Sequence, residues 1–175
     1  MSLLFLSWLT LVSAAGGTQD PLSFTAGQKA AVIIFVTPDC PVANALLPEV
    51  ARLQHEFKSR GVSFALVHVD PSTTPRQAVE HAAAFHITCA VLLDPRHQLA
   101  SKLGATRTPE AFVVTPDGKT AYHGRINDLY FAPGQRRRAP TREDLRDALT
   151  SVVAGKAVPK SESPAVGCVV ADFIR

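Results

Sequence analysis

Two of the three cysteines stand where a thiol could do chemistry, and Cys40 is the clearer of them. It follows an unbroken apolar run over residues 31–36 and a short polar turn, and it directly precedes Pro41, which can open a helix. A short run rich in β-branched residues is typical of a strand buried on both faces. Cys40 is therefore expected where a strand ends and a helix begins, and there the free N–H groups and the helix dipole favour a thiolate.

The other two cysteines differ in their expected roles. Cys168 follows Gly167 near the end of a tail that contains proline, serine and alanine. It either returns to Cys40 as a second redox thiol, which needs the two Cα atoms within about 7 Å, or simply packs with the tail. Cys89 lies at the edge of an apolar strand and is expected to be an inert core residue.

The elements that must position these thiols alternate along the first part of the chain. Apolar runs closed by Gly or by Asp-Pro pairs predict strands, and the segments between them have helical patterns. The strands are expected at 31–36, 62–69 and 90–93, and the helices at about 41–59, 75–85 and 98–103. This alternation predicts βαβ units and a parallel sheet.

The pattern then changes to a hairpin and a final helix. Two short runs, 111–115 and 119–123, flank an Asp-Gly turn, which is a strong hairpin signal. A helix is expected over 142–153, with Thr141 as its N-cap and a glycine at its end. The predicted architecture is a single α/β domain with a central mixed sheet.

Composition narrows the functional classes. The chain has 175 residues, 46% hydrophobic and 19% charged, which suits one globular domain, and its formal charge of +3 is too small to argue for nucleic acid. Arg136, Arg137 and Arg138 form one dense basic spot. We interpret it as a solvated loop, with a phosphate or lipid site as the alternative.

Residues 1–17 are predicted to be a secretory signal peptide. The apolar run 3–12 is shorter than the roughly 20 residues that span a bilayer, and Val12-Ser13-Ala14 suits cleavage near Ala14 or Ala15. The segment before the run has no Lys or Arg, so a mis-assigned start or an uncleaved anchor stays open. We expect a secreted or periplasmic domain over 18–157 and a tail over 158–175, without stable membrane insertion after cleavage, in a compartment where disulfides persist.

The order of elements, a cysteine after the first central strand and Thr108-Pro109 before the hairpin together resemble the thioredoxin fold. Four blocks, 39–44 (Asp-Cys-Pro-Val-Ala-Asn), 104–110, 122–128 and the terminal Gly-Cys, resemble a peroxiredoxin-like subgroup, related to AhpC/TSA, of the redoxin branch that also holds the TlpA-like proteins. The resemblance covers about 24–169. It implies a thioredoxin-like fold in which Pro109 is cis and faces Cys40.

The resemblance also implies a site. Thioredoxins and most TlpA-like reductases use C-x-x-C, but the second position here is Ala43, so the loop itself holds no second thiol. Peroxiredoxins use one peroxidatic cysteine with Thr or Ser three residues earlier, which Thr37 matches, whereas their usual upstream proline falls at Ile33.

In a peroxidatic site a thiolate attacks, donors orient the peroxide, and a cation stabilises the leaving hydroxide. Cys40 would supply the thiolate, Thr37 a hydroxyl, and Arg125 or Arg107 the cation. A second thiol, for which Cys168 is the candidate, must then capture the sulfenic acid before it oxidises further.

Two further residues are candidates for contacts beside the thiol. Thr108 would present backbone groups there. Asn44, one helical turn after Cys40, either hydrogen-bonds near the thiol or is a plain surface residue. Of the histidines, we expect His55, His81 and His97 at the surface, and His68 and His123 near the cysteine end of the sheet.

Three functions follow. The first is a hydroperoxide-reducing enzyme that acts through Cys40 and is recycled by a thiol donor of thioredoxin type. The second is a thiol–disulfide oxidoreductase that acts on protein disulfides through one active-loop cysteine. The third is a non-catalytic binding or copper-delivery module, although Asn44 stands where a C-x-x-x-C copper pair would have its second cysteine. We expect no bound cofactor or metal, and the oligomeric state is left open.

Overall fold

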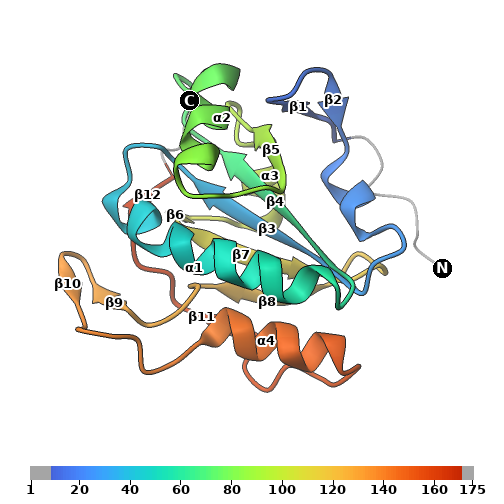
Figure 1. Cartoon of the computed structure of the whole chain (residues 1–175), viewed down its shortest axis with the longest axis vertical. Helices are drawn as coiled ribbons and strands as arrows, with labels where there is room; N and C mark the ends of the chain where they lie inside the picture. The colour runs from blue at the N-terminus through green and yellow to red at the C-terminus, as the bar shows by residue number, and fades with distance from the viewer. Residues whose placement is uncertain (1–8, 171–175) are drawn as a thin grey trace.

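A twisted eight-stranded mixed sheet forms the centre of the molecule (Figure 1). The computed structural model describes residues 9–170, apart from the side chain of Leu22. The strand order in the sheet is β11-β8-β7-β3-β4-β5-β1-β2. These strands are β1 (Leu11–Ser13), β2 (Thr18–Gln19), β3 (Ala30–Val36), β4 (Val62–His68), β5 (Ala90–Leu93), β7 (Glu110–Val114), β8 (Thr120–Gly124) and β11 (Glu162–Ser163).

The parallel core of the sheet accounts for the apolar runs in the sequence. All residues of β3 are buried, and β3 pairs in parallel with β4 from Ala30–Val62 to Val36–His68. β5 continues the parallel sheet on the other side of β4. The predicted strands 31–36, 62–69 and 90–93 are therefore confirmed to within a residue.

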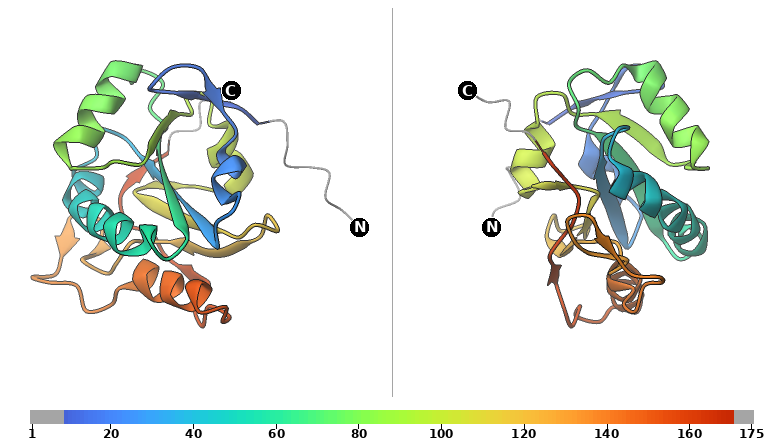
Figure 2. Two further views of the ribbon diagram at one scale, coloured as in Figure 1. Left: turned by 45° about the vertical axis from the view of Figure 1, so that its right-hand side comes forward. Right: turned by 90° about the vertical axis from the view of Figure 1, so that its left-hand side faces the viewer.

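Helices cover both faces of this sheet (Figure 2). Because side chains alternate along a strand, Val32 and Ile34 of β3 face a core shared with α1, α2 and α4, whereas Ile33 and Phe35 face a second core that includes α3. The helices are α1 (Pro41–Lys58), α2 (Pro75–Ala84), α3 (Gln98–Leu103) and α4 (Asp144–Val153). A short 3₁₀ helix, Pro21–Thr25, precedes β3.

The helix starts follow from local residues, with one correction. Cys40 caps α1, and Thr74 caps α2 with a reciprocal bond to Gln77. The predicted cap of the last helix, Thr141, is wrong. Its hydroxyl donates to Asp128 at 2.6 Å, and α4 begins three residues later. A buried carboxylate is the stronger acceptor, and it draws Thr141 away from the helix end.

The hairpin β7–β8 lies antiparallel beside β3 and brings the Thr108–Pro109 pair to the end of the sheet where α1 begins. The peptide bond between Thr108 and Pro109 is cis, as the resemblance implied. Thr108 belongs to a two-residue strand, β6 (Arg107–Thr108).

The C-terminal tail docks along the same end of the sheet. Its strand β11 pairs with β8, and β12 (Cys168–Val169) pairs antiparallel with β6, with Cys168 opposite Thr108. A Cβ atom at Gly167 would lie 2.0 Å from the Thr108 carbonyl oxygen, so only glycine allows the tail to approach so closely. Sequence patterns did not predict these short tail strands.

A two-stranded ribbon projects from the body between β8 and α4 (Figure 1). We call residues 129–138 the arm; it contains β9 (Tyr130–Ala132) and β10 (Gln135–Arg136), which pair with each other. The start of the arm packs on the core through Leu129 and Tyr130.

At the other edge of the sheet, β1 pairs antiparallel with both β2 and β5. β1 lies inside the segment predicted as a signal peptide, and its Leu11 is buried. Cleavage near Ala14 or Ala15 would remove β1 and leave β5 at the edge. The signal peptide stays a prediction, and its first eight residues lie outside the described part of the chain. Among residues 9–170, no helix has the length and apolar character needed to cross a bilayer.

Candidate active site around Cys40 and Cys168

The Cys40 side chain sits at the N-terminus of α1 and is fully buried. Its sulfur accepts a hydrogen bond from the Ala43 N–H at 3.5 Å, and its S–H donates to the Thr108 carbonyl oxygen at 3.0 Å. The first of these contacts exists because the early N–H groups of a helix have no partner within the helix. Cys40 is thus held between the start of a helix and the cis-proline loop.

The surroundings of Cys40 favour its thiolate. Burial acts to raise the pKa of the thiol, but hydrogen bonds from the Cys168 thiol, the Ala43 N–H, the Thr108 hydroxyl and the Cys168 N–H hold the pKa below its usual value. The Thr108 hydroxyl is buried, makes no hydrogen bond of ordinary geometry with a described residue, and acts to lower the pKa of Cys168 as well as that of Cys40. It is therefore a spare donor that Cys40 can use once it has lost its proton.

Cys168 is the second thiol of the site. It lies opposite Thr108 in the β6–β12 pair, is half-buried, and contacts Cys40 through its side chain. Burial and the neighbouring Cys40 raise the pKa of Cys168 to about 11. The two thiols are therefore unequal: Cys40 is the more readily ionised of the pair, and Cys168 is the less readily ionised. Both are free thiols in this structure.

Glu110 braces the loop that ends in Pro109. Its buried carboxylate accepts hydrogen bonds from the N–H groups of Thr106 and Arg107 at 2.8 and 3.1 Å. The segment before the cis peptide bond is thereby tied to the first residue of β7. The Thr108 carbonyl and hydroxyl consequently have a fixed position beside Cys40.

The structure brings together four of the residues predicted for the site, namely Cys40, Cys168, Thr108 and Pro109. Arg125 is engaged elsewhere, because its guanidinium binds the Asp144 carboxylate at the start of α4, with Nε 2.8 Å from Oδ2. The other arginine candidate, Arg107, lies opposite Val169 and so beside the tail.

The two polar candidates near the loop have clear places. The Thr37 carbonyl accepts from the Cys40 N–H at 3.2 Å, so Thr37 closes the turn that carries the thiol. The Asn44 side chain binds the Pro38 carbonyl oxygen at 2.8 Å and His81 at 2.8 Å. The roles of these polar and arginine candidates in catalysis stay predictions.

Two of the histidine predictions are wrong. His97 is buried, with its Nε2 2.7 Å from the Val69 carbonyl oxygen. His81 is half-buried and lies between His68 and Asn44. Helical position alone could not reveal this, because the partner of His81 on β4 is far along the chain. His55 is exposed, as expected.

Cys89 is the thiol whose pKa is raised most. Burial raises its pKa to about 12, so little thiolate forms at neutral pH. This agrees with its interpretation as an inert residue and makes Cys89 a useful internal control.

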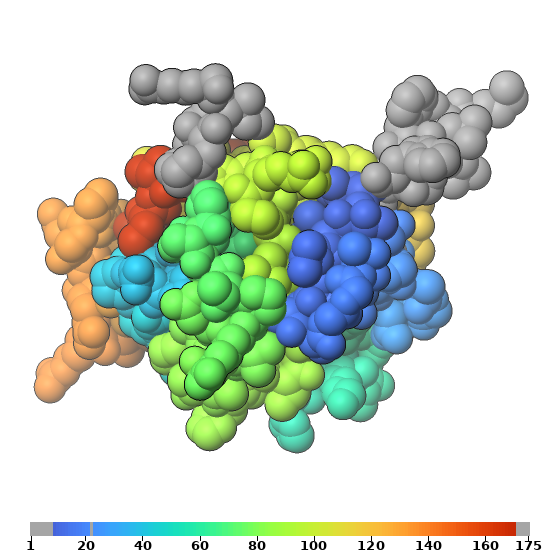
Figure 3. Space-filling model, turned by 90° about the horizontal axis from the view of Figure 1, so that it is seen from above, coloured from blue at the N-terminus to red at the C-terminus, as the bar shows by residue number. Residues whose placement is uncertain are grey.

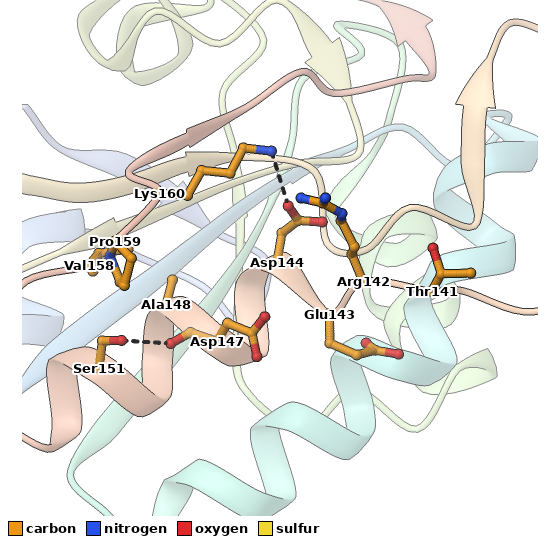
Figure 4. Close-up of a pocket in the computed structure, with 10 residues that line it drawn as sticks. All are labelled: Thr141, Arg142, Glu143, Asp144, Asp147, Ala148, Ser151, Val158, Pro159 and Lys160. Atoms are coloured by element: carbon orange, nitrogen blue, oxygen red, sulfur yellow. Dashed lines mark hydrogen bonds and ion pairs between the residues drawn. The ribbon is translucent and has the colours of Figure 1, made fainter.

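A separate hollow lies between α4 and the tail (Figure 4). It encloses about 620 Å³ and is lined by residues 141–144, 147–148, 151 and 158–160. Its Asp144 is 3.6 Å from the Lys160 ammonium and also binds Arg125. The charges of Asp144 and Lys160 therefore offset each other, whereas Glu143 Oε2 is buried with no hydrogen-bond partner among the described residues. Within residues 9–170 no three His, Cys, Asp or Glu side chains gather as a metal site.

A buried cysteine of lowered pKa at a helix N-terminus, a cis-proline loop against its sulfur and a mixed sheet with helices on both faces define a thioredoxin-fold redox protein. The chain belongs to the AhpC/TSA family, whose model matches residues 9–123. Among curated proteins, none matches this chain.

Solved structures share the fold. A hypothetical protein from Sinorhizobium meliloti is 23% identical, with a TM-score of 0.82, and the match covers 93% of this chain and 89% of that one. An uncharacterized conserved protein from Geobacillus kaustophilus is 24% identical, with a TM-score of 0.81 and coverage of 93% and 87%. A secreted Mycobacterium tuberculosis disulfide oxidoreductase, homologous to Escherichia coli DsbE, is 19% identical, with a TM-score of 0.58 and coverage of 84% and 95%.

Proposed function

We propose that this chain is a secreted or periplasmic thiol peroxidase whose redox pair is Cys40 and Cys168. The observation that carries the proposal is the contact between a buried thiol of lowered pKa and a second thiol of raised pKa. The first is suited to attack, and the second waits beside it as a resolving thiol. Membership of the AhpC/TSA family supports the same chemistry.

The reaction proceeds in two balanced steps. The Cys40 thiolate attacks one oxygen of a hydroperoxide, so that an S–O bond forms, the O–O bond breaks and the leaving oxyanion takes up a proton. The sulfur of Cys168 then attacks the sulfenic acid, a disulfide forms, and the hydroxide that leaves combines with the thiol proton as water. An external dithiol returns two electrons to the disulfide and completes the cycle.

The burial of Cys40 favours a small oxidant. A sulfur with none of its surface exposed, beneath the docked β12, is reached more readily by hydrogen peroxide than by a disulfide on another protein. Donors are already directed at this sulfur, namely the N–H groups of Ala43 and Cys168 and the hydroxyl of Thr108. They can orient a peroxide once it has reached the sulfur.

The second candidate is thiol–disulfide exchange on proteins. It is favoured by the cis-proline loop against Cys40 and by the likeness of the fold to a secreted disulfide oxidoreductase. In that reaction Cys40 attacks a substrate disulfide, a substrate thiolate leaves, and Cys168 displaces the second substrate sulfur. This route requires the tail to leave Cys40 first.

The arm supports a proposal about the electron donor. Figure 3 shows the arm, the start of α1 and β12 on one face of the molecule. Among the described residues, Arg137 has an ion-pair partner, Asp128, whereas Arg136 and Arg138 have none. Phe131 of the arm and Val169 of β12 are exposed apolar residues. We propose that this rim receives a protein dithiol with an acidic surface.

Rates of oxidation separate the two chemistries. The reduced Cys89→Ser variant is mixed with hydrogen peroxide or with oxidised glutathione, and loss of thiolate absorbance is followed over time, with Cys40→Ser as the blank. We expect peroxide to react at least about a hundredfold faster than the disulfide, because the tail limits access of the larger oxidant to the sulfur. Faster reaction with the disulfide would favour the second candidate, and no reaction with either would refute both.

A further inference from the structure

A chain of hydrogen bonds joins the interior of the sheet to the loop that carries Cys40. His68 Nε2 of β4 lies 2.9 Å from His81 Nδ1 of α2, and His81 Nε2 lies 2.8 Å from Asn44 Oδ1 of α1. Asn44 Nδ2 then donates to the Pro38 carbonyl oxygen at 2.8 Å. Pro38 is two residues before the reactive cysteine. The peroxidase mechanism above uses none of these side chains.

The chemistry of the groups fixes the direction of every hydrogen bond in the chain. A carbonyl oxygen only accepts, so the atom of Asn44 that faces Pro38 is its NH₂ group, and the atom that faces His81 is its oxygen. His81 must therefore donate from Nε2. A neutral His81 then has a bare Nδ1, which accepts the N–H of His68 Nε2.

This assignment explains an otherwise costly feature of the core. With its proton on Nε2, His68 has an unprotonated Nδ1, which is buried and makes no hydrogen bond of ordinary geometry within the described chain, although the Leu92 backbone acts to raise the pKa of the ring. Burial and the adjacent His81 lower the pKa of His68 to about 3, and burial also lowers the pKa of His81. Both rings are therefore neutral at physiological pH, as the chain requires.

The rings are also fixed by packing. His68 is fully buried, and its ring meets His81 edge-on with centroids 5.1 Å apart. On its other side His81 meets Phe85 edge-on at 5.4 Å. Because both rings are held in place, the hydrogen bond from His81 fixes the position of the Asn44 side chain. Asn44 in turn fixes the position of the Pro38 carbonyl through its own hydrogen bond.

We propose that His81 and Asn44 are positioning residues that hold the Cys40 loop in the geometry that stabilises its thiolate. The inference rests on the proposed function only in taking Cys40 as the reacting thiol. Neither side chain touches the sulfur in the contacts described. They act through Pro38 and through the turn that the Cys40 N–H closes on the Thr37 carbonyl.

The physical reason is the length of the bond from the Ala43 N–H to the Cys40 sulfur, which is 3.5 Å. This is an ordinary length for an N–H···S hydrogen bond, so the bond is intact in this loop geometry, and a small shift of the loop would lengthen and weaken it. Loss of the anchor frees the Pro38 carbonyl and lets the loop move. The thiolate then loses part of its stabilisation, and the pKa of Cys40 rises.

The test measures the ionisation of Cys40 alone. In a Cys89→Ser/Cys168→Ser background Cys40 is the only thiol, and the substitution at position 168 keeps a hydroxyl donor beside it. Thiolate absorbance and the rate of alkylation by iodoacetamide are recorded against pH for His81→Ala, His81→Gln, Asn44→Leu and the double variant His81→Ala/Asn44→Leu. Exposed His55→Ala on the same helix as Asn44 is the matched control.

We expect His81→Ala and Asn44→Leu each to raise the pKa of Cys40 by about one unit, which reduces the thiolate fraction below that pKa about tenfold. The double variant should be no worse than either single one, because the residues act in series. In His81→Gln the pKa of Cys40 should stay close to that of the parent, since the glutamine amide can donate to Asn44. His55→Ala should leave the pKa unchanged.

An unchanged pKa of Cys40 in both His81→Ala and Asn44→Leu would overturn the proposal, as would additive effects in the double variant or failure of His81→Gln to rescue. If His81 and Asn44 only stabilised the fold, their replacement would lower thermal stability. It would not raise the pKa of Cys40 non-additively, and His81→Gln would not reverse such a rise. The outcome is independent of peroxidase activity, because ionisation and alkylation are measured without an oxidant. Failure of the proposed function is recognised separately, by the lack of any peroxide reaction in the parent protein.

Discussion

At the scale of single residues, the site depends on an imbalance between two thiols. Cys40 has several hydrogen-bond donors around its sulfur, and Cys168 lies next to the charge that Cys40 carries as a thiolate. The same contact therefore lowers one pKa and raises the other. In the proposed mechanism this difference in pKa makes Cys40 the sulfur that attacks the peroxide and Cys168 the resolving thiol.

Removal of the waiting thiol should expose Cys40 to irreversible oxidation. In Cys168→Ser, peroxide still converts Cys40 to a sulfenic acid, but no adjacent thiol captures it, so excess peroxide drives it to the sulfinic acid. Peptide mass spectrometry should show two or three added oxygens on Cys40 in this variant and a disulfide in the parent. Equal over-oxidation in both proteins would contradict a resolving role for Cys168.

The neutral His68 should make stability depend on pH. Its pKa is about 3 in the folded protein and about 6.5 in the unfolded chain, so between these values the unfolded chain binds the proton more tightly. The stability that comes from neutral His68 is therefore present above about pH 6.5 and is lost as pH falls toward 3. Between pH 7 and pH 5 this amounts to about 2 kcal/mol.

Urea unfolding at the two pH values measures this loss. In His68→Leu the free energy of unfolding should fall by about 2 kcal/mol less than in the parent over the same interval. The control is His55→Leu, which removes an exposed histidine and should keep the parent's pH dependence. An identical pH dependence in His68→Leu and the parent would show that His68 is not buried as a neutral ring.

At the scale of elements, the site is assembled from three places in the chain: the start of α1, the β6–β7 junction with its cis-proline, and the tail strand β12. Gly167 is the residue that permits the third. In Gly167→Ala the new methyl group would clash with the Thr108 carbonyl oxygen, at a cost of about 1–3 kcal/mol. We expect the tail to undock and disulfide formation after peroxide to slow by about ten- to a hundredfold, because the two sulfurs are no longer held together.

Non-reducing peptide maps after timed quenching measure that rate. Ala165→Gly, two residues earlier, adds no atom near Thr108 and is the control for altered tail flexibility. Sulfenic acid on Cys40 should accumulate in Gly167→Ala and not in the control. Equal rates of disulfide formation in the two variants would mean that close docking of the tail is not needed.

The elements themselves were largely predictable from the sequence. The apolar run of β3, the Asp-Gly turn of the hairpin and the position of Cys40 are local signals, and each was interpreted correctly. The short strands β6, β11 and β12 were not predicted, because a two-residue strand has no periodic pattern and forms only where another segment is already in place. The contact between Cys40 and Cys168 could be proposed from the sequence but not established.

The histidine chain lay beyond sequence reasoning for a related physical reason. His68, His81 and Asn44 come from three different elements, and their contacts depend on the packing of α1 and α2 against the end of β4. The one local hint was that Asn44 lies a turn after Cys40. The same limit applies to Thr141. Its hydroxyl donates to the Asp128 carboxylate, which is 13 residues away in the sequence and therefore could not be recognised as its partner from the sequence.

At the scale of the whole molecule, β12, which carries Cys168, lies on the same face as the basic arm (Figure 3). If an acidic dithiol protein reduces the disulfide, Arg136→Glu/Arg138→Glu should slow that reduction about tenfold at low salt. The difference should shrink as salt screens the charges. Arg76→Glu, an exposed charge reversal on α2, is the control for a change of charge away from the arm.

The comparison uses acidic and basic thioredoxin-type proteins as donors, with dithiothreitol as an uncharged one. Only reduction by the acidic donor should depend on the arm, and dithiothreitol should reduce the parent and both variants equally. Equal rates with the acidic donor in the parent and the arm variant would place the docking surface elsewhere.

The central claim is that Cys40 and Cys168 are one redox pair, and one measurement tests it most directly. The reduced protein is treated with one equivalent of hydrogen peroxide, quenched in acid, alkylated and digested, and the fate of Cys40, Cys89 and Cys168 is read by mass spectrometry. We predict a disulfide between the peptides of Cys40 and Cys168, with Cys89 alkylated as a free thiol. If Cys40 instead stays a thiol, or pairs with Cys89 while Cys168 is alkylated, the account is contradicted.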